Sequence, residues 1–70
     1  MKKEWPHEIH IYYEVTRARE LLNWLHEQGH VLHETVRFGK NHQKTGDPKI
    51  TQQVFFKDPQ QAMMFKLAWA

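Results

Sequence analysis

The side chains that could bind a metal or transfer a proton are six histidines and eight acidic residues, spread over 70 residues. His26, His30 and His33 come closest to metal-binding spacing, but Gly29 is expected to end a helix between the first two. Their i, i+4 geometry is then lost. Because the chain has no cysteine and no carboxylate at a recognised ligand spacing, the sequence predicts neither a metal site nor a bound cofactor.

Nucleophilic and phosphate-binding chemistry is poorly represented as well. The chain contains neither serine nor cysteine, so the common oxygen and sulfur nucleophiles reduce to threonine and tyrosine. The glycines of residues 39–46 lack the spacing of a phosphate-binding loop. His10 and Glu14 share one face of a predicted strand, but a single pair does not make a catalytic site. The sequence therefore predicts a protein that is not an enzyme.

The element that the sequence defines best is the last one, because residues 54–69 read as the end of a strand, a sharp stop and a helix. Asp58 is a typical N-cap residue, and Pro59 fits the first helical position, where its missing N–H is no loss. Gln61 completes an Asp-x-x-Gln variant of the capping box. We expect this helix to be covered on more than one side, because it is apolar almost all round.

A strand and a helix are predicted in the first half of the chain. Residues 8–15 alternate between apolar and polar side chains, which is typical of a half-buried strand. The residues expected to face the core are Ile9, Ile11, Tyr13 and Val15. Thr16 is then a plausible N-cap for a helix running to about Gln28, and Gly29 would supply its left-handed stop.

Two further strands are predicted over residues 31–38 and 50–57, joined by a long polar turn over residues 39–49. In the third strand Ile50, Val54 and Phe56 are expected to face the core, whereas the facing of the second strand stays open, with Leu32, Val36 and Phe38 as one alternative for its inward side. This facing would turn Glu34 inward, unless the second strand lies at an exposed edge or a bulge resets its register.

The resulting order β-α-β-β-α predicts a single α+β domain over residues 1–70, with residues 1–7 as a loose lead-in. We expect a three-stranded antiparallel sheet, in the order 2-3-1, with two helices on one face. This topology resembles ferredoxin-like folds without their last strand. The outer edge of the first strand is then open, and edges of this kind invite pairing with another chain. The second face of the sheet would carry no helix.

That uncovered face is the first candidate surface. Tyr12 and Phe55 are expected to point outward on adjacent strands, with His10, His33, Arg37 and Lys57 around them and with Lys40 and Lys44 on the basic turn. The arrangement resembles RNA-recognition-motif domains, in which outward aromatic residues of two strands stack on bases. The chain lacks the Gly-rich aromatic signature of that family and its fourth strand. Alternatively, Tyr12 and Phe55 are buried in a homodimer interface or under Trp5.

The last helix provides the second candidate surface. Ala62, Phe65 and Trp69 follow helical spacing and are expected to meet the core. Met63 and Met64 then lie on other sides of the helix, where methionines suit an adaptable binding surface unless the first helix covers them.

The closing sequence FKDPQQAMMFKLAW, over residues 56–69, is similar to the tails of short open reading frames of unassigned function in bacteriophages. Those tails also combine an acidic-Pro helix cap, a small residue, a phenylalanine and a terminal tryptophan. The resemblance implies a phage-encoded protein that acts by binding a host macromolecule, and it carries no catalytic residues across.

The sequence thus predicts a small, self-associating interaction module that binds another protein, with binding of RNA or single-stranded DNA as the alternative. The predicted partner-binding residues are Tyr12, Phe55, Arg37, Lys57, Lys40, Lys44, Met63 and Met64. Residues 1–36 carry four basic and six acidic groups, whereas residues 37–70 carry six basic and two acidic groups, so the second half favours an anionic partner. No apolar run is long enough for a membrane span or a signal peptide, and with the absence of cysteine this predicts a cytoplasmic protein.

Overall fold

The computed structural model describes residues 4–70, so residues 1–3 of the predicted lead-in lie outside the described residues. Strand β1 (His7–Glu14) leads through a short 3₁₀ turn, η1 (Val15–Arg17), into helix α1 (Ala18–Glu27). The remaining elements are the strands β2 (Val36–His42) and β3 (Lys49–Phe56) and the helix α2 (Pro59–Trp69). The element order β-α-β-β-α is the predicted one.

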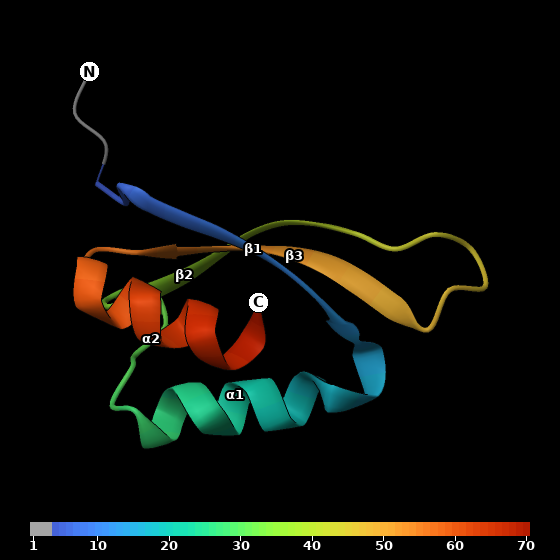
Figure 1. The fold of residues 1–70 in the computed structure, drawn as a ribbon, viewed down its shortest axis with the longest axis horizontal. Helices are drawn as coiled ribbons and strands as arrows, with labels where there is room; N and C mark the ends of the chain where they lie inside the picture. Colours follow the sequence, from blue (N-terminus) through green and yellow to red (C-terminus); the bar gives the residue numbers. More distant parts are fainter. Residues whose placement is uncertain (1–3) are drawn as a thin grey trace.

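The three strands form an antiparallel sheet in the order β1-β3-β2. Both helices lie on one side of this sheet, and in the described part of the chain the other side carries no helix (Figure 1). The prediction of an α+β fold with this sheet and two helices is therefore confirmed. Within residues 4–70, no helix combines the length and the apolar character that crossing a membrane requires.

The core lies between the sheet and the two helices. Its buried apolar members are Ile9, Ile11, Leu21, Leu25, Val36, Val54, Phe56, Ala62 and Phe65. Phe65 of α2 is at its centre, because its ring contacts Phe56 of β3 with centroids 5.1 Å apart and Trp24 of α1 with centroids 5.9 Å apart. Burial of these rings in a water-free layer is the main term that holds the two helices against the sheet.

Helix α2 begins at the predicted residue, but the predicted capping box with Gln61 is wrong, because the cap bond of Asp58 goes to Gln60. The side chain of Asp58 accepts a hydrogen bond from the amide of Gln60 at 2.8 Å, and Pro59 occupies the first helical position. Ala62 and Phe65 are buried and Trp69 is half-buried, so the predicted inward stripe of the helix is confirmed. Trp69 packs edge-on against Tyr13 of β1 and lies under the guanidinium of Arg17.

Helix α1 begins later than predicted. The prediction that Thr16 caps it is wrong, because Thr16 lies inside the 3₁₀ turn and the helix starts at Ala18 with no side-chain cap bond. The turn is fixed instead by the amide of Val15, which donates to the carbonyl of Pro48 at 2.9 Å. This placement leaves Val15 outside β1 and 42% exposed, so its predicted position in the core is wrong as well.

The C-terminus of α1 matches its prediction in detail. Gly29 adopts a φ of +82°, and the amides of Gly29 and His30 donate to the carbonyls of His26 and Leu25 at 3.0 and 2.9 Å. This pair of bonds is a Schellman motif, which stops the helix and satisfies its last carbonyls. It also turns the chain toward the loop that precedes β2.

Strand β2 differs most from its prediction, since it starts at Val36 and not at residue 31. The reason is Thr35, whose hydroxyl accepts a hydrogen bond from the amide of Val31 at 2.9 Å and whose amide donates to the carbonyl of Val31 at 3.0 Å. These bonds close residues 31–35 into a turn. Leu32 is consequently 47% exposed and not in the core, and Glu34 is exposed, which removes the predicted burial of a carboxylate.

The strand also continues further than predicted, through residues 39–42 of the supposed polar turn. A bulge lies between Phe38 and Asn41, where two residues, Gly39 and Lys40, stand opposite the single residue Gln53 of β3. The sequence allows a bulge in this strand, but within residues 31–38. The turn between the two strands is therefore shorter than the sequence indicates and spans residues 43–48.

Candidate interaction surfaces

Two surfaces of the molecule are candidates for binding a partner. The first is the open face, meaning the sheet face without helices, which carries the outward side chains of the three strands. The second is the β1–α2 flank, which consists of the outer edge of β1 and the exposed residues Pro59, Met63, Met64 and Leu67 of α2.

Tyr12 and Phe55 point outward on adjacent strands of the open face, as predicted, but they do not lie side by side. Tyr12 is opposite Thr51, whereas Phe55 is opposite Glu8. The two aromatic residues are thus four residues apart along the strand direction, which corresponds to about 13 Å. The two rings are therefore too far apart to stack on neighbouring bases in the manner of the RNA-recognition motif.

The two aromatic side chains also have different surroundings. The phenol of Tyr12 donates a hydrogen bond to the carboxylate of Asp47 at 3.1 Å, and the ammonium of Lys49 lies 5.2 Å from its ring centre. The hydrogen bond to Asp47, then burial and the charge of Asp47, raise the pKa of Tyr12. Phe55 instead covers the backbone of Gly39, where a Cβ atom would lie 2.6 Å from its ring. Tyr12 therefore contacts the turn before β3, and Phe55 packs against the bulge of β2.

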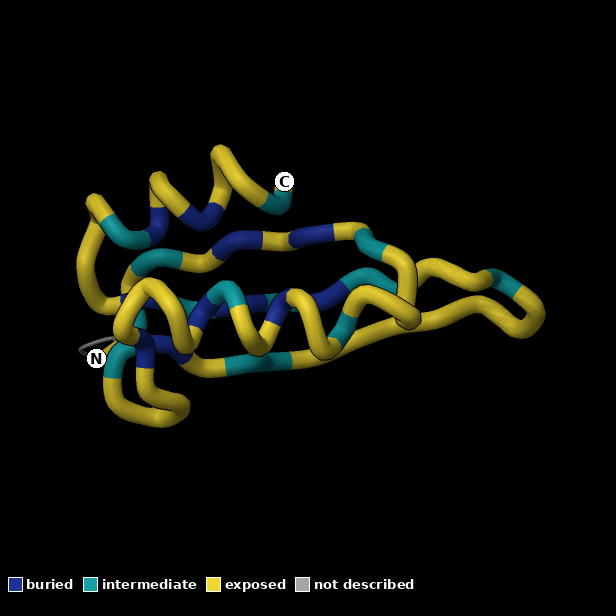
Figure 2. The backbone as a smooth tube through the Cα atoms, turned by 90° about the horizontal axis from the view of Figure 1, so that it is seen from below, coloured by how far each residue is buried: buried dark blue, intermediate teal, exposed yellow. Residues whose placement is uncertain are grey.

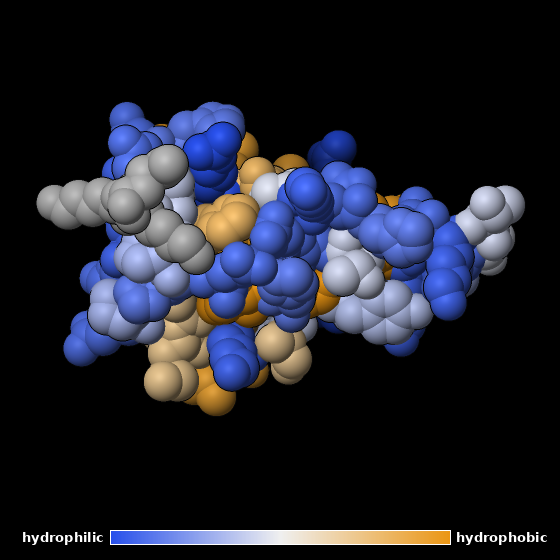
Figure 3. Space-filling view, turned by 90° about the horizontal axis from the view of Figure 1, so that it is seen from above, coloured by the Kyte–Doolittle hydropathy of each residue, from blue (hydrophilic) through white to orange (hydrophobic). Residues whose placement is uncertain are grey.

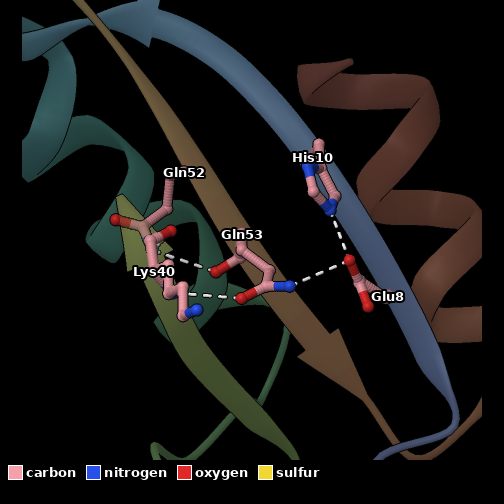
Figure 4. A network of polar contacts seen from close by, with 5 residues as sticks. All are labelled: Glu8, His10, Lys40, Gln52 and Gln53. Carbon is pink, nitrogen blue, oxygen red and sulfur yellow. Dashed lines mark hydrogen bonds and ion pairs between the residues drawn. The ribbon is translucent and has the colours of Figure 1, made fainter. Parts of the chain in front are cut away.

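The bulge is held by glutamine side chains on both sides of the sheet (Figure 4). On the open face, the side-chain carbonyl of Gln53 accepts from the amide of Lys40 at 3.1 Å. On the helix side, the buried amide group of Gln52 donates to the carbonyls of Gly39, Lys40 and Gln53 at 3.1, 3.4 and 2.9 Å. The polar side chain of Gln52 is thus tolerated in the core layer because its donors are satisfied.

The same network continues to β1. The side-chain nitrogen of Gln53 donates to the carboxylate of Glu8 at 2.8 Å, and His10 contacts the same carboxylate oxygen (Figure 4). Glu8 therefore links two strands through one oxygen atom. The network lies beside a shallow hollow of about 280 Å³, whose lining residues are His10, Lys40, Asn41, His42, Thr51 and Gln53.

The predicted basic residues are distributed over the whole open face. Arg37 of β2 lies opposite Phe55 of β3. Lys40 lies in the bulge of β2, whereas the sequence predicts it in a turn. Lys57 lies over the ring of Trp5, 4.7 Å from its centre, at one end of the sheet, and Lys44 lies in the turn at the other end. His33, which was expected nearby, lies in the turn before β2 with a φ of 69°.

The hydrogen-bonding pattern of β1 determines what its outer edge presents. In an antiparallel pair, residues that exchange hydrogen bonds alternate with residues that do not. The bond from the amide of Val15 to Pro48 continues the β1–β3 register by one step, so the odd-numbered residues of β1 direct their amides and carbonyls toward β3. Those of Glu8, His10, Tyr12 and Glu14 point the other way. Among the described residues, β1 pairs with β3 alone.

Helix α2 lies next to this edge. Seen from below, it extends along the margin of the sheet beyond β1, whereas α1 crosses the middle of the sheet (Figure 2). Met63 and Leu67 are two positions from the buried Phe65, about 200° around the helix, and so lie on the side away from the core. They are 60% and 80% exposed, and Met64 is 51% exposed. Seen from above, apolar side chains gather along this margin beside the largely hydrophilic open face (Figure 3).

A third feature was not predicted from the sequence. The turn before β2 and α1 enclose an apolar hollow of about 500 Å³, lined by Leu22, Leu25, His26, His30, Val31, Leu32 and Val36. His30 is buried at its base, where Nδ1 lies 3.1 Å from the hydroxyl of Thr35, and burial lowers the pKa of the imidazole. The hollow was missed because residues 31–35 were assigned to a strand, and the pairing of Thr35 with Val31 was the signal for a turn.

Within residues 4–70, no three histidine, aspartate or glutamate side chains come together in a way that could hold a metal ion. No family model, curated protein or solved structure matches this chain.

Proposed function

We propose that this protein is a small non-enzymatic interaction module, which binds protein through the β1–α2 flank. The observation that carries the proposal is the apolar stripe of Met63, Met64 and Leu67, exposed at 60%, 51% and 80%, next to the outward-pointing backbone groups of β1. A regular strand edge offers main-chain hydrogen bonds to a partner, and a neighbouring apolar surface offers burial. Flexible methionine side chains can adapt to the shape of what they contact.

The topology supports the same flank. We regard the fold as ferredoxin-like with the outer side of β1 open, because among the described residues β1 pairs with β3 alone. Helix α2 extends past β1, so a strand added at this edge would lie over the helix (Figure 2). A partner segment would thus occupy the open side of β1. In a phage-encoded protein, such a surface could block or redirect a host protein by contact alone.

Site-specific photo-crosslinking tests this function. We expect p-benzoylphenylalanine in place of Leu67 to give covalent adducts with protein, either a second copy or a different chain. The same group in place of Glu27, an exposed residue of α1, provides the matched control. Adducts at Leu67 that do not exceed those at Glu27, in the cell that makes the protein, would contradict the proposal.

Binding of single-stranded RNA or DNA is the second candidate function. It is favoured by the hollow on the open face, where Lys40, His10 and His42 bring two imidazoles and an ammonium together beside Arg37. The separation of Tyr12 and Phe55 argues for contacts to phosphates more than for stacked bases.

A salt series with labelled random single-stranded RNA tests this second function by fluorescence anisotropy. Phosphate binding predicts that the logarithm of the affinity falls with the logarithm of the salt concentration, with a slope of about −0.7 per phosphate contacted. Lys40→Glu should flatten this slope, whereas Lys66→Glu, the same charge change on α2, should leave it unaltered. No binding at low salt would remove this candidate and would leave the β1–α2 flank unaffected.

A further inference from the structure

We propose that the partner at the β1–α2 flank is a second copy of this chain, with the two β1 strands paired antiparallel about a two-fold axis at His10. This inference rests on the proposed function and specifies its partner. The outcome would be a continuous six-stranded sheet in which each α2 covers part of the other copy.

The direction of the backbone groups of β1 decides which residues can bond to a second copy. Glu8, His10, Tyr12 and Glu14 direct their backbone groups outward, so they must form the hydrogen-bonded pairs with the partner strand. Directly opposite residues lie on the same face of a sheet, so an odd-numbered residue cannot stand opposite an even-numbered one without turning a core face to water. Each permitted register therefore centres the two-fold axis on a single residue of β1.

The number of residues over which the two β1 strands overlap limits the position of the axis. β1 runs from His7 to Glu14, and only axes at His10 or at Ile11 keep seven of its residues opposite the partner's β1. With the axis at Ile11, Glu8 stands opposite Glu14 of the other copy, and this occurs twice. Like charges directly opposite each other destabilise a sheet. With the axis at His10, Glu14 falls beyond the partner's strand, and no two carboxylates within the strand overlap are opposed.

The register centred on His10 places particular residue pairs opposite each other on both faces of the sheet. On the open face, Glu8 stands opposite Tyr12 of the other copy, and the two His10 side chains stand opposite each other at the axis. On the helix side, Ile9 stands opposite Ile11 of the other copy, and both are buried residues of their own core. The apolar row of each core therefore continues across the seam, with a polar row above it.

The position of α2 determines the space beside β1 for a second copy. The backbone of helix α2 runs from the His7 end of β1 to near its middle (Figures 1 and 2), and the side chain of its last residue, Trp69, reaches Tyr13 in the other half. The two-fold axis places the second α2 at the other half, so the C-terminal ends of the two helices meet near the axis, where Trp69 of each copy lies beside Tyr13. Because α2 extends past β1, it would lie against the end of the partner strand. The β2 edge offers no such surface, since its pairing is interrupted by the bulge between Phe38 and Asn41.

Disulfide trapping tests the register, because the chain has no cysteine of its own. Hydrogen-bonded antiparallel pairs have Cα atoms about 5.5 Å apart, which is within reach of a disulfide. We expect His10→Cys to form a covalent dimer roughly a hundredfold faster than Tyr12→Cys alone, because paired thiols react at a high effective concentration. Tyr12→Cys mixed with Glu8→Cys should give the mixed dimer at the fast rate.

A backbone variant tests the edge itself. Tyr12→Pro removes one outward amide without touching the bonds to β3, and edge strands accept proline. Tyr12→Ala removes the same side chain and keeps the amide. We expect Tyr12→Ala to sediment as a dimer and Tyr12→Pro as a folded monomer.

Three results would overturn the inference: a monomeric wild-type chain, fastest trapping at a residue other than 10, or a Tyr12→Pro variant that remains dimeric. Adducts of residue 67 with a different protein, combined with a monomeric chain, would reject the second copy and retain the proposed function.

Discussion

The amide nitrogen of Val15 lies 2.9 Å from the carbonyl oxygen of Pro48, and this bond fixes the hydrogen-bonding phase of the whole of β1. It assigns the backbone groups of Ile9, Ile11 and Tyr13 to β3 and those of His10 and Tyr12 to the outer edge. The same bond ends the strand and starts the 3₁₀ turn. A contact in the turn region thus determines which residues of the strand a partner can reach.

Gly39→Ala is expected to lower stability by about 1–3 kcal/mol, because a Cβ at this position must displace side chains in a packed bulge. That atom would lie 2.3 Å from the side-chain oxygen Oε1 of Gln53 and 2.6 Å from the ring of Phe55. Urea unfolding followed by tryptophan fluorescence measures the change. Lys40→Ala, at the neighbouring exposed position, is the control and should stay within about 0.5 kcal/mol of the wild type. Equal stability of the two variants would show that the bulge is not built as described.

Asp58→Ala is expected to cost about 1 kcal/mol, because it leaves the amide of Gln60 without its cap at the start of α2. Asp58→Asn keeps an oxygen acceptor and should recover most of the loss. Chemical unfolding of the three proteins at one pH gives the comparison. If the Asn and Ala variants were equally destabilised, the side-chain oxygen would not be acting as the cap.

Phe65→Ala is expected to cost about 3–5 kcal/mol, since the ring fills the centre of the core and its removal leaves a cavity. Leu67→Ala, two positions away on the exposed side of α2, should cost less than about 0.5 kcal/mol in the monomer. Denaturation at low protein concentration separates this fold effect from any effect on association. A large loss at Leu67 under those conditions would mean that α2 is oriented differently.

Stability is expected to fall on acidification because of His30. Burial lowers the pKa of this imidazole in the folded chain below its ordinary value of 6.5. The unfolded chain therefore binds a proton first, so the contribution of His30 is complete above about pH 6.5 and is lost as the pH falls toward the folded pKa.

His30→Gln should reduce this dependence of the unfolding free energy on pH, because it removes the buried imidazole and keeps a polar side chain at the position. Unfolding curves recorded at several values between about pH 8 and pH 5 give the slopes. A slope that the His30 variant shares with the wild type would assign the effect to other groups.

The sequence predicts best where local rules act alone. Asp58, Pro59 and Gly29 each act within a few residues of their own position, and the structure confirms the helix start and the helix stop that they indicate. The alternation of β1 is equally clear, because Ile9 and Ile11 are buried and Glu8 and His10 are exposed. The order of the strands in the sheet could then be predicted from the way in which the chain connects these elements.

Prediction failed where one side chain redirects the backbone. Thr35 closes a turn on Val31, and Gln52 and Gln53 hold a bulge at Gly39 from across the sheet. These contacts join residues whose partners cannot be read from hydropathy, so strand β2 was placed five residues too early. The separation of Tyr12 from Phe55 also required the register between strands, since the sequence indicates only the face on which each lies.

Sedimentation equilibrium of the wild-type chain, over a range of concentrations, tests the account most directly. A self-paired β1 edge predicts a species of twice the 8.5 kDa chain mass that dissociates on dilution and is lost in the Tyr12→Pro variant. A single species of 8.5 kDa at every concentration would contradict self-pairing and would leave the β1–α2 flank to a different protein.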